Sequence, residues 1–212
     1  MLVAALCSGC SGNPFKSTDS FASYYAENKE EAGSDLEGMA ADLAVVSDSE
    51  ATDPNYQSND YADLLINDSA NEIVESYHCF DKLYPASITK VMTALLTLEH
   101  GNMDDEITLK HDINLTEDGA VISTLTKGDT VTVSQVFHTM LIKSANDCAV
   151  ILAEYVAGSE AKFIDMMNER AKELGATHTH FVNPNGLHNN DHYTTAYDLY
   201  LIFKAVSYTH LR

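Results

Sequence analysis

Two pairs of polar residues have the types and the spacing needed for nucleophilic catalysis. The first pair is Ser87 and Lys90, within the run SITK. Residues three apart on a helix lie on the same face, so the Lys90 amine can reach the Ser87 hydroxyl and act as its base. A helix that begins close to Ser87 would also direct unpaired backbone N–H groups at a developing oxyanion. This pair predicts a serine nucleophile site.

The second pair, Ser144 and Asn146, lies between apolar-periodic segments at residues 136–141 and 149–156. A Ser-x-Asn sequence at a helix-to-helix junction can point both side chains into one cleft. Each pair alone has an ordinary explanation, because serine and asparagine are common cap and turn residues and a lone Ser-x-x-Lys is a weak motif. Together, and in this order, the two pairs favour the catalytic interpretation.

With these motifs the chain resembles the serine D-alanyl-D-alanine carboxypeptidases, the low-molecular-mass penicillin-binding proteins of peptidase family S11. The resemblance covers residues 61–206, and it is carried by residues 84–94 (YPASITKVMTA), 143–147 (KSAND), 167–168 (MN) with 171–175 (AKELG), and 181–187 (FVNPNGL). Penicillin-binding proteins and class A β-lactamases share Ser-x-x-Lys, Ser-Asp-Asn and Lys-Thr-Gly motifs. Here Ala145 takes the middle position of the second motif. The resemblance implies the α+β penicillin-binding protein/β-lactamase transpeptidase-like fold.

The resemblance also implies a reaction and a role for each of the four residues. Ser87 would attack the penultimate D-alanine of a peptidoglycan stem peptide ending in D-Ala-D-Ala, and Lys90 would accept its proton. Ser144 would relay the proton to the leaving D-alanine, and Asn146 would hydrogen-bond the substrate and the Lys90 amine. Water would then hydrolyse the acyl-enzyme, β-lactams would inhibit it, and no metal or cofactor is involved. Lys90 needs a lowered pKa for this task, to which burial and a neighbour such as Lys143 would contribute.

One motif of the resembled family is absent from the sequence. No Lys-Thr-Gly or Lys-Ser-Gly follows Ser144, and the approximate match at residues 126–128 (TKG) precedes it and is predicted to be a loop. We therefore expect the fold to be incomplete, with the C-terminal strands of the sheet missing. Residues 61–206 would be a partial catalytic domain and residues 207–212 a tail foreign to it. These 212 residues by themselves are expected to have weak carboxypeptidase activity or none, because half of the oxyanion hole is lacking.

The apolar periodicity of residues 61–206 predicts a hairpin, two further short strands and a series of helices. Gly101 is expected to end the nucleophile helix, and Gly175 a later one. The last helix is expected to be capped by Thr194 or Thr195. The predicted elements are hairpin strands at 62–66 and 73–77, short strands at 107–109 and 130–133, and helices that begin near Ser87, after a cap at Ser134, near 149, near 160 and near 196.

The N-terminal part of the chain carries different signals. Residues 1–10 look like the end of a bacterial lipoprotein signal, with small residues before Cys10, which would be lipidated. Residues 11–60 are rich in Ser, Asp, Glu, Asn and Ala, which predicts an acidic flexible linker. We expect an extracytoplasmic protein of the bacterial cell envelope, either secreted or anchored to the membrane through this lipid.

Composition narrows the partners further. The net charge of −20 argues against nucleic acid, whose phosphates such a surface repels. The four cysteines form no convincing disulfide framework. Cys148 is predicted to be a buried free thiol that behaves as a small apolar side chain, and no role is assigned to Cys79.

A zinc-dependent hydrolase is an alternative from a different class. Imidazole and carboxylate side chains crowd one region, and such groups can hold zinc for peptide hydrolysis. Their spacing matches none of the tight helical zinc motifs, so a histidine-rich polar loop explains them better. The residues concerned are His178, His180, His188, Asp191 and His192.

Two further alternatives share the serine site. A class A-like β-lactamase needs a deacylating glutamate on a loop, but Glu160, Glu169 and Glu173 fall in a predicted helix. Slow deacylation is therefore expected. A noncatalytic penicillin-binding or wall-binding module is favoured by the missing third motif, yet degeneration would be expected to erode Ser87 and Lys90 as well.

Overall fold

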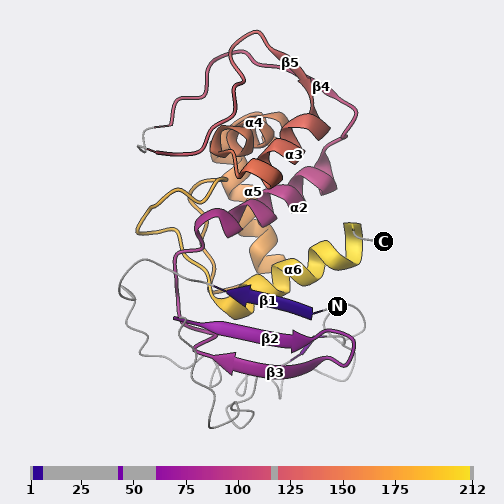
Figure 1. Ribbon diagram of the computed structural model, residues 1–212, viewed down its shortest axis with the longest axis vertical. Coiled ribbons are helices and arrows are strands. Elements are labelled where there is room, and N and C mark those ends of the chain that lie inside the picture. Colours follow the sequence, from indigo (N-terminus) through magenta and orange to yellow (C-terminus); the bar gives the residue numbers. More distant parts are fainter. Residues whose placement is uncertain (1, 7–42, 45–60, 116–118, 211–212) are drawn as a thin grey trace. The chain divides into compact units, whose positions relative to one another are not determined.

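The structure, a computed structural model, describes residues 2–6, 43–44, 61–115 and 119–210. The chain divides into two compact units (Figure 1). The first, here called the sheet unit, comprises Met1–Leu83 and Thr194–Tyr200; the second, the helical unit, comprises Tyr84–Tyr193 and Leu201–Arg212. Cys10 and all of the predicted linker except Leu43 and Ala44 lie outside the described residues.

The sheet unit contains a three-stranded antiparallel sheet in the order β1-β2-β3. The predicted hairpin is confirmed: β2 (Asp63–Asn67) pairs with β3 (Glu72–Tyr77), with a register shift between Leu65 and Ile66. Leu64 and Ile66 are buried while Leu65 between them is less so, as the alternation of side chains along a strand requires. Part of the predicted leader forms β1 (Leu2–Leu6), which pairs with the other side of β2.

The start of α6 (Ala196–His210) belongs to the sheet unit. The Thr195 hydroxyl accepts a hydrogen bond from Asp198 N at 3.0 Å, so of the two predicted caps Thr195 is the one used. Two tyrosines of this first part bind one short segment: Ala44 N donates to the Tyr200 hydroxyl at 3.0 Å, and the Tyr197 hydroxyl donates to Ala44 O at 3.2 Å. The helix continues through His210, past residue 206.

The helical unit is built around α4 (Asn146–Ala157), which contacts three other helices. Every residue of α4 from Asn146 to Ala153 is buried, as expected for a helix that is apolar on nearly all sides. Its neighbours are α2 (Lys90–His100), α3 (Val133–Lys143) and α5 (Glu160–Glu173), and the two-stranded sheet of β4 (Glu106–Thr108) and β5 (Thr130–Thr132) precedes α3. Helices and antiparallel strands together give the predicted α+β class.

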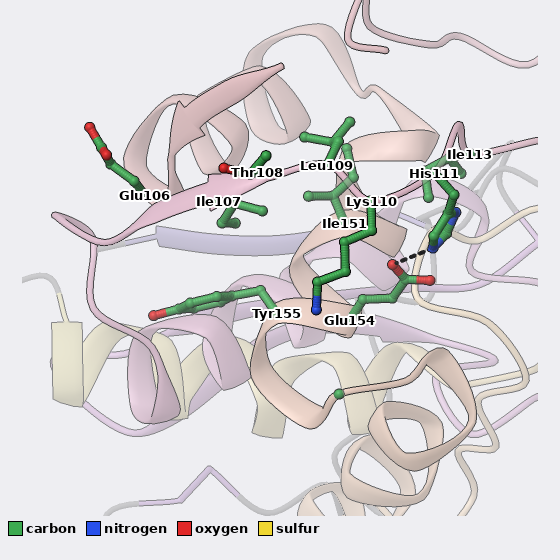
Figure 2. Close-up of a pocket in the computed structure, with 11 residues that line it drawn as sticks. Glu106, Ile107, Thr108, Leu109, Lys110, His111, Ile113, Ile151, Glu154 and Tyr155 are labelled. Atoms are coloured by element: carbon green, nitrogen blue, oxygen red, sulfur yellow. Dashed lines mark ion pairs between the residues drawn. The ribbon is translucent and has the colours of Figure 1, made fainter. Parts of the chain in front are cut away.

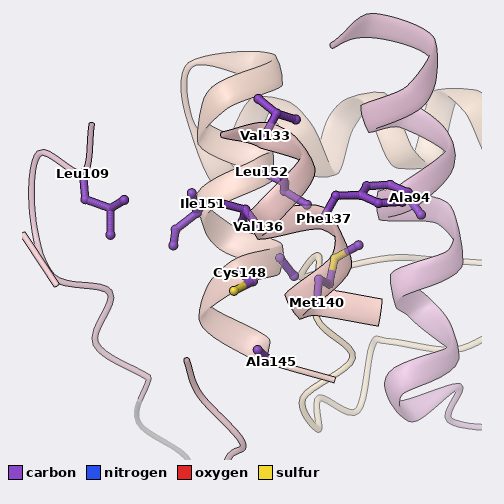
Figure 3. Close-up of a cluster of buried hydrophobic side chains, with 11 residues drawn as sticks. Ala94, Leu109, Val133, Val136, Phe137, Met140, Ala145, Cys148, Ile151 and Leu152 are labelled. Carbon is purple, nitrogen blue, oxygen red and sulfur yellow. The ribbon is translucent and has the colours of Figure 1, made fainter. Parts of the chain in front are cut away.

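One core of this unit lies between α3 and α4 (Figure 3). Val136, Phe137 and Met140 of α3 pack with Ile151 and Leu152 of α4, and all five are at most 8% exposed. Burial of this apolar surface holds the two helices together. Their junction contains Ser144 and Asn146, so the same packing fixes where those polar side chains lie.

Both cysteines in the described part of the chain are buried free thiols. Cys148 is fully buried in the α3–α4 core, as predicted, and burial raises the pKa of its thiol to about 12. Burial also raises the pKa of Cys79 to about 12. Both side chains are therefore neutral and act as small apolar groups at physiological pH.

The predicted start of α3 is wrong by two residues. The cap is Thr132, not Ser134: the Thr132 hydroxyl accepts from Gln135 N at 3.2 Å, and the Gln135 side-chain oxygen accepts from Thr132 N at 2.9 Å. This reciprocal capping box satisfies two backbone donors at once, which a cap at Ser134 would not. Gly101 follows the last residue of α2, as predicted, and Gly175, at φ +81°, lies just past α5. Among the described residues, no helix combines the length and apolarity needed to cross a bilayer.

Candidate active site

The predicted nucleophile lies where a short 3-10 turn, η2 (Ala86–Thr89), runs directly into α2. Ser87 is exposed, whereas Lys90 at the first position of α2 is only 3% exposed. Ala86, immediately before the serine, has φ +48°, a left-handed conformation that costs energy for a residue with a Cβ. Such local strain is tolerated where surrounding contacts enforce it, and it concentrates at functional sites.

Three acceptors surround the Lys90 amine. Its Nζ lies 3.1 Å from Ser87 Oγ, 2.8 Å from Asn146 Oδ1 and 2.7 Å from the backbone carbonyl oxygen of Asn185. An ammonium group has three N–H donors, so these contacts match its full donor capacity. A neutral amine fits the same positions: two N–H groups donate to the two carbonyl oxygens, and the nitrogen lone pair faces the serine hydroxyl.

Burial lowers the pKa of Lys90 from 10.5 to about 8. Burial destabilises the charged form of a lysine, because the ammonium loses its hydration. The predicted contribution of Lys143 is not found: burial alone accounts for the lowered pKa, and Lys143 is exposed. A pKa near 8 leaves about a tenth of the amine neutral at pH 7, which is sufficient for a general base.

The orientation of the Asn146 side chain is fixed by a backbone carbonyl on another segment. Asn146 Nδ2 donates to Val121 O at 3.1 Å, and Asn146 N donates to the same oxygen at 2.8 Å. Because the NH₂ end of the amide is held there, its oxygen end faces Lys90. The amide therefore presents an acceptor to the lysine.

The segment that carries Val121 is itself anchored by a buried carboxylate. Asp147, 4% exposed, accepts hydrogen bonds from Ser123 N at 2.9 and 3.0 Å and from Ser123 Oγ at 2.5 Å, and it also accepts from Cys148 N at 2.9 Å. These charge-assisted bonds satisfy both carboxylate oxygens. Asp147, the residue after Asn146, thus fixes the position of the segment that carries Val121.

Ser144 completes the group. It is the C-cap of α3, with φ +57°, a conformation that turns the chain between α3 and α4. Its Oγ lies 3.0 Å from Ser87 Oγ. The structure thus brings together all four predicted site residues. Three of them line a cavity of about 340 Å³, whose lining residues are Ser87, Ile88, Lys90, Val91, Met140, Leu141, Ser144 and Phe203.

The loop of residues 183–187 supplies the third acceptor of the Lys90 amine, the carbonyl oxygen of Asn185. Pro184 O accepts from the Thr93 hydroxyl at 2.6 Å, one helical turn beyond Lys90. Within the loop, Asn183 Oδ1 accepts from Gly186 N at 2.7 Å, and Asn183 Nδ2 donates to Leu187 O at 2.9 Å. Asn183 therefore shapes the loop, and the loop places the Asn185 carbonyl on the lysine.

The histidine-rich region does not gather into a metal site. His188 stands edge-on to the Tyr84 ring, His180 Nδ1 donates to the Asp191 backbone carbonyl at 2.6 Å, and His192 is buried. The described residues contain no group of three or more His, Cys, Asp or Glu side chains arranged to hold a metal ion. The zinc alternative has no support in this part of the chain.

A second pocket, of about 400 Å³, runs along β4 and the outer face of α4 (Figure 2). Ile107 and Tyr155 are among its lining residues, and His111 Nε2 pairs with Glu154 Oε2 across it at 3.1 Å. None of the four predicted site residues contributes to it.

Sequence reasoning missed the backbone acceptors of the site. The carbonyl groups of Asn185 and Val121 hold Lys90 and Asn146, yet every residue has a carbonyl, so neither contact has a side-chain signature. It also missed the buried contact between His192 Nε2 and Thr89 Oγ1, at 2.8 Å. The Asn-Pro-Asn-Gly turn at 183–186 was the available signal that this loop has a fixed conformation.

Solved structures define the class of this protein. The D-alanyl-D-alanine carboxypeptidase DacD from Francisella tularensis superimposes with a TM-score of 0.68 at 27% identity, covering 84% of this chain and 43% of its own. Penicillin-binding protein D2 from Listeria monocytogenes, in its cefotaxime-bound form, gives a TM-score of 0.66 at 28% identity, covering 75% of this chain and 66% of its own. The predicted penicillin-binding, transpeptidase-like fold is confirmed, and this chain covers part of it.

The sequence defines the family more narrowly. The profile of the D-alanyl-D-alanine carboxypeptidase family, peptidase S11, matches residues 47–211, so the chain belongs to this family. D-alanyl-D-alanine carboxypeptidase DacF of Bacillus subtilis is 35% identical over 149 residues, and DacC of Escherichia coli is 34% identical over 152. Each match covers 68% of this chain but only 38% of the relative, so the chain spans under half the length of these proteins.

Proposed function

We propose that the chain carries the nucleophile centre of a serine-type D-alanyl-D-alanine carboxypeptidase. Its substrate is a peptidoglycan stem peptide that ends in D-Ala-D-Ala, and β-lactams inhibit it by acylating the same serine. The observation that carries this proposal is the network in which Lys90 Nζ contacts Ser87 Oγ and Asn146 Oδ1 while Ser144 Oγ contacts Ser87 Oγ. Family membership supports the choice of substrate.

The first half of the reaction forms an ester. Lys90 in its neutral form takes the proton of the Ser87 hydroxyl, 3.1 Å away, and the serine oxygen attacks the carbonyl carbon of the penultimate D-alanine. The tetrahedral intermediate collapses as the C–N bond breaks. The leaving amine takes a proton from Ser144, which is 3.0 Å from Ser87 Oγ, and Ser144 regains a proton from the Lys90 ammonium as the terminal D-alanine departs.

The second half of the reaction restores the serine. Water attacks the ester carbonyl and gives one proton to neutral Lys90. The ester C–O bond then breaks, Lys90 returns the proton to Ser87 Oγ, and the shortened peptide leaves. The Asn146 amide stays oriented by Val121 O, so it can hydrogen-bond the peptide and Lys90 without reorganising. Preorganisation of this kind is the main source of transition-state stabilisation in acyl-transfer sites.

The serine β-lactamase alternative is less well supported. Deacylation in class A enzymes needs a glutamate near the ester, but Glu160, Glu169 and Glu173 all belong to α5. None of them is hydrogen-bonded to Ser87, Lys90, Ser144 or Asn146 in the described part of the chain. We propose that the penicilloyl-enzyme therefore accumulates.

A noncatalytic binding module is also less well supported. A binding site has no use for a lysine whose pKa burial lowers to about 8, because desolvating an ammonium only costs stability. A buried amine beside an exposed serine is useful when a proton must be removed at neutral pH.

Intact-mass spectrometry with benzylpenicillin separates the three candidates. The carboxypeptidase proposal expects one penicilloyl adduct, located on the Ser87 peptide and absent from Ser87→Ala. An adduct that forms slowly still supports this proposal, because the ester accumulates over hours. Rapid hydrolysis of a chromogenic cephalosporin without an adduct would favour the β-lactamase. A folded chain that binds penicillin reversibly and forms no adduct would favour the binding module.

We propose an extracytoplasmic location in the bacterial cell envelope, where peptidoglycan substrates occur. Lipidation of Cys10 would anchor the protein there, although one acyl chain alone gives marginal binding and a lipoprotein anchor has more than one. Metabolic labelling with a fatty-acid analogue, compared between the wild type and Cys10→Ala, tests this anchor. Equal labelling of both would contradict it.

A further inference from the structure

His192 is a buried titratable group to which the proposed reaction assigns no role. It is 2% exposed. It contacts η2 (Ala86–Thr89), the turn that carries Ser87, here called the nucleophile turn. Its ring contacts two segments: Nε2 is 2.8 Å from Thr89 Oγ1, and Nδ1 is 3.1 Å from Val182 N. Thr89 stands between Ser87 and Lys90 in the sequence, and Val182 begins the stretch that leads to Asn185.

The hydrogen-bond partners determine the protonation state of this ring. A backbone N–H can only donate, so Val182 N–H donates to Nδ1 and that nitrogen carries no proton. The neutral imidazole then has its proton on Nε2, which donates to the Thr89 hydroxyl. An imidazolium ion would place a second N–H against Val182 N–H, so protonation breaks this contact.

The ring is held by its own segment as well. His192 N donates to Asn189 O at 3.0 Å, and the next residue, Tyr193, exchanges two backbone hydrogen bonds with His180 at 2.8 and 3.0 Å. The Phe181 ring packs on the imidazole with a centroid distance of 5.7 Å. The ring therefore has little freedom to find other partners.

We propose that neutral His192 is a positioning residue that clamps the nucleophile turn to the loop that presents the Asn185 carbonyl to Lys90. This inference rests on the proposed function of the same site. The clamp works with two other contacts between the same segments, Thr93 with Pro184 O and Lys90 with Asn185 O. It acts on the lysine indirectly, by fixing the distance between the amine and one of its three acceptors.

The charged surroundings support a neutral ring. Burial, and to a smaller extent His180, lower the pKa of His192 from 6.5 to about 4. His180, His188, Asp191 and Tyr193 are titratable side chains on the loop segments next to the ring, and all of them except Tyr193 are exposed. On the nucleophile side, the charged group nearest in sequence is Lys90. The clamp is therefore closed at neutral pH and opens as the pH falls to about 4.

The test compares His192→Gln with His192→Phe in the whole chain. A glutamine side chain offers an NH₂ donor group and a carbonyl acceptor, so it can replace both contacts of the neutral imidazole, and it does not titrate. Phenylalanine fills the space without hydrogen bonds. His188→Phe is the matched control, because this exposed histidine of the same loop makes an edge-on ring contact that phenylalanine retains.

Two NMR measurements need no substrate: the pKa of the Lys90 amine and the exchange protection of the Val182 amide. We expect His192→Phe to loosen the loop and let water reach the Lys90 amine. Because burial is what lowers the pKa of this amine, the pKa should rise by about one pH unit or more, and Val182 exchange should speed up roughly tenfold or more. His192→Gln and His188→Phe should keep both near wild-type values. In the wild type, Val182 protection should fall with a midpoint at the His192 pKa of about 4, and His192→Gln should not show this transition.

Several outcomes would overturn the clamp. An unchanged Lys90 pKa in folded His192→Phe would do so, as would a wild-type His192 that titrates near 6.5 or carries its proton on Nδ1. If His192→Phe does not fold, the wild-type titration and His192→Gln still decide. Failure of penicillin to label Ser87 in a chain with the expected titrations would instead sink the proposed function alone.

Discussion

Gly186 packs backbone to backbone against Ala86, the residue just before Ser87, the proposed nucleophile. A Cβ placed on Gly186 would stand 1.8 Å from the Ala86 carbonyl oxygen and 2.4 Å from its carbon. Gly186 also has φ +85°, a conformation that favours glycine. The loop that bears the Asn185 carbonyl can therefore reach the nucleophile turn only because residue 186 has no side chain.

Gly186→Ala is expected to unfold or displace this loop. The new methyl group would meet backbone atoms of Ala86, which cannot rotate away as a side chain would. We therefore expect the free energy of unfolding to fall by more than about 4 kcal/mol. Gly158→Ala is the matched control: Gly158 has φ +77° but nothing within 4 Å of its added Cβ, so only the left-handed conformation is penalised, by about 1–2 kcal/mol. Chemical denaturation measures both, and equal losses would contradict the close packing.

The Lys90 amine is expected to titrate near pH 8, well below an ordinary lysine. Burial is the cause, so the neutral fraction should rise from about a tenth at pH 7 to about half at pH 8. NMR of the lysine side chains follows the titration directly. The penicillin acylation rate should rise over the same pH range.

Lys143→Ala serves as the control for this titration. Lys143 is exposed and lies next to Ser144, but it does not contribute to the lowered pKa of Lys90. The midpoint should therefore remain near 8. A shift toward 10.5 in this variant would mean that repulsion, not burial, sets the pKa.

Asn146→Asp is expected to keep Lys90 protonated. A carboxylate in place of the amide oxygen, 2.8 Å from Nζ, favours the ammonium and should raise the Lys90 pKa by roughly one to three pH units. Val121 O also loses the side-chain donor. Acylation at pH 7 should fall tenfold or more, by about the same factor as the neutral amine, and recover in part at higher pH.

Asn102→Asp is the matched control for that change. Asn102 is exposed beyond the other end of α2, and its side-chain oxygen accepts from Asp104 N at 3.1 Å, a bond that aspartate keeps. This variant adds the same charge without approaching the amine. If both variants shift the lysine titration equally, general charge and not the local contact is responsible.

Protonation of His192 should make the protein less stable in acid. The folded-state pKa, about 4, lies below the ordinary value of 6.5, so between these values the unfolded chain binds the proton and the folded chain does not. The contribution is fully present above pH 6.5 and is lost as the pH falls toward 4, by up to roughly 3 kcal/mol.

Urea denaturation at several pH values measures this loss. Carboxylates titrate in part of the same range, so the informative quantity is the difference in the free energy of unfolding between the wild type and His192→Gln. That difference should shrink as the pH falls from 6.5 to 4. Parallel stability curves would show that the ring is not buried in its neutral form.

The side chains of the site were predictable because their relationship is local. Ser87 and Lys90 are related by helical periodicity, and Ser144 and Asn146 occupy one helix junction, so spacing along the chain already constrains them. The apolar patterns of residues 149–156 and 160–174 likewise predicted the helices α4 and α5. Together with the family resemblance, these patterns were enough to predict the fold class and to expect that these four side chains lie close together.

The acceptors that hold those side chains were not predictable in the same way. Asn185 O lies 95 residues from Lys90, and Val121 O lies 25 residues from Asn146. Both are backbone groups, so their use depends on how loops meet after folding and not on residue type. The start of α3 was predicted wrongly for a different reason. Thr132 and Ser134 are both good caps, and only Gln135, three residues after Thr132, distinguishes them by completing the capping box.

Val121 O receives two hydrogen bonds, and both come from Asn146. A ligand that pulls this strip of backbone away would let the amide rotate, and the lysine would lose an acceptor that favours its charged form. Compounds that never touch the serine could thereby tune its reactivity from the side, which makes residues 119–123 a place to look for remote inhibitors and activators.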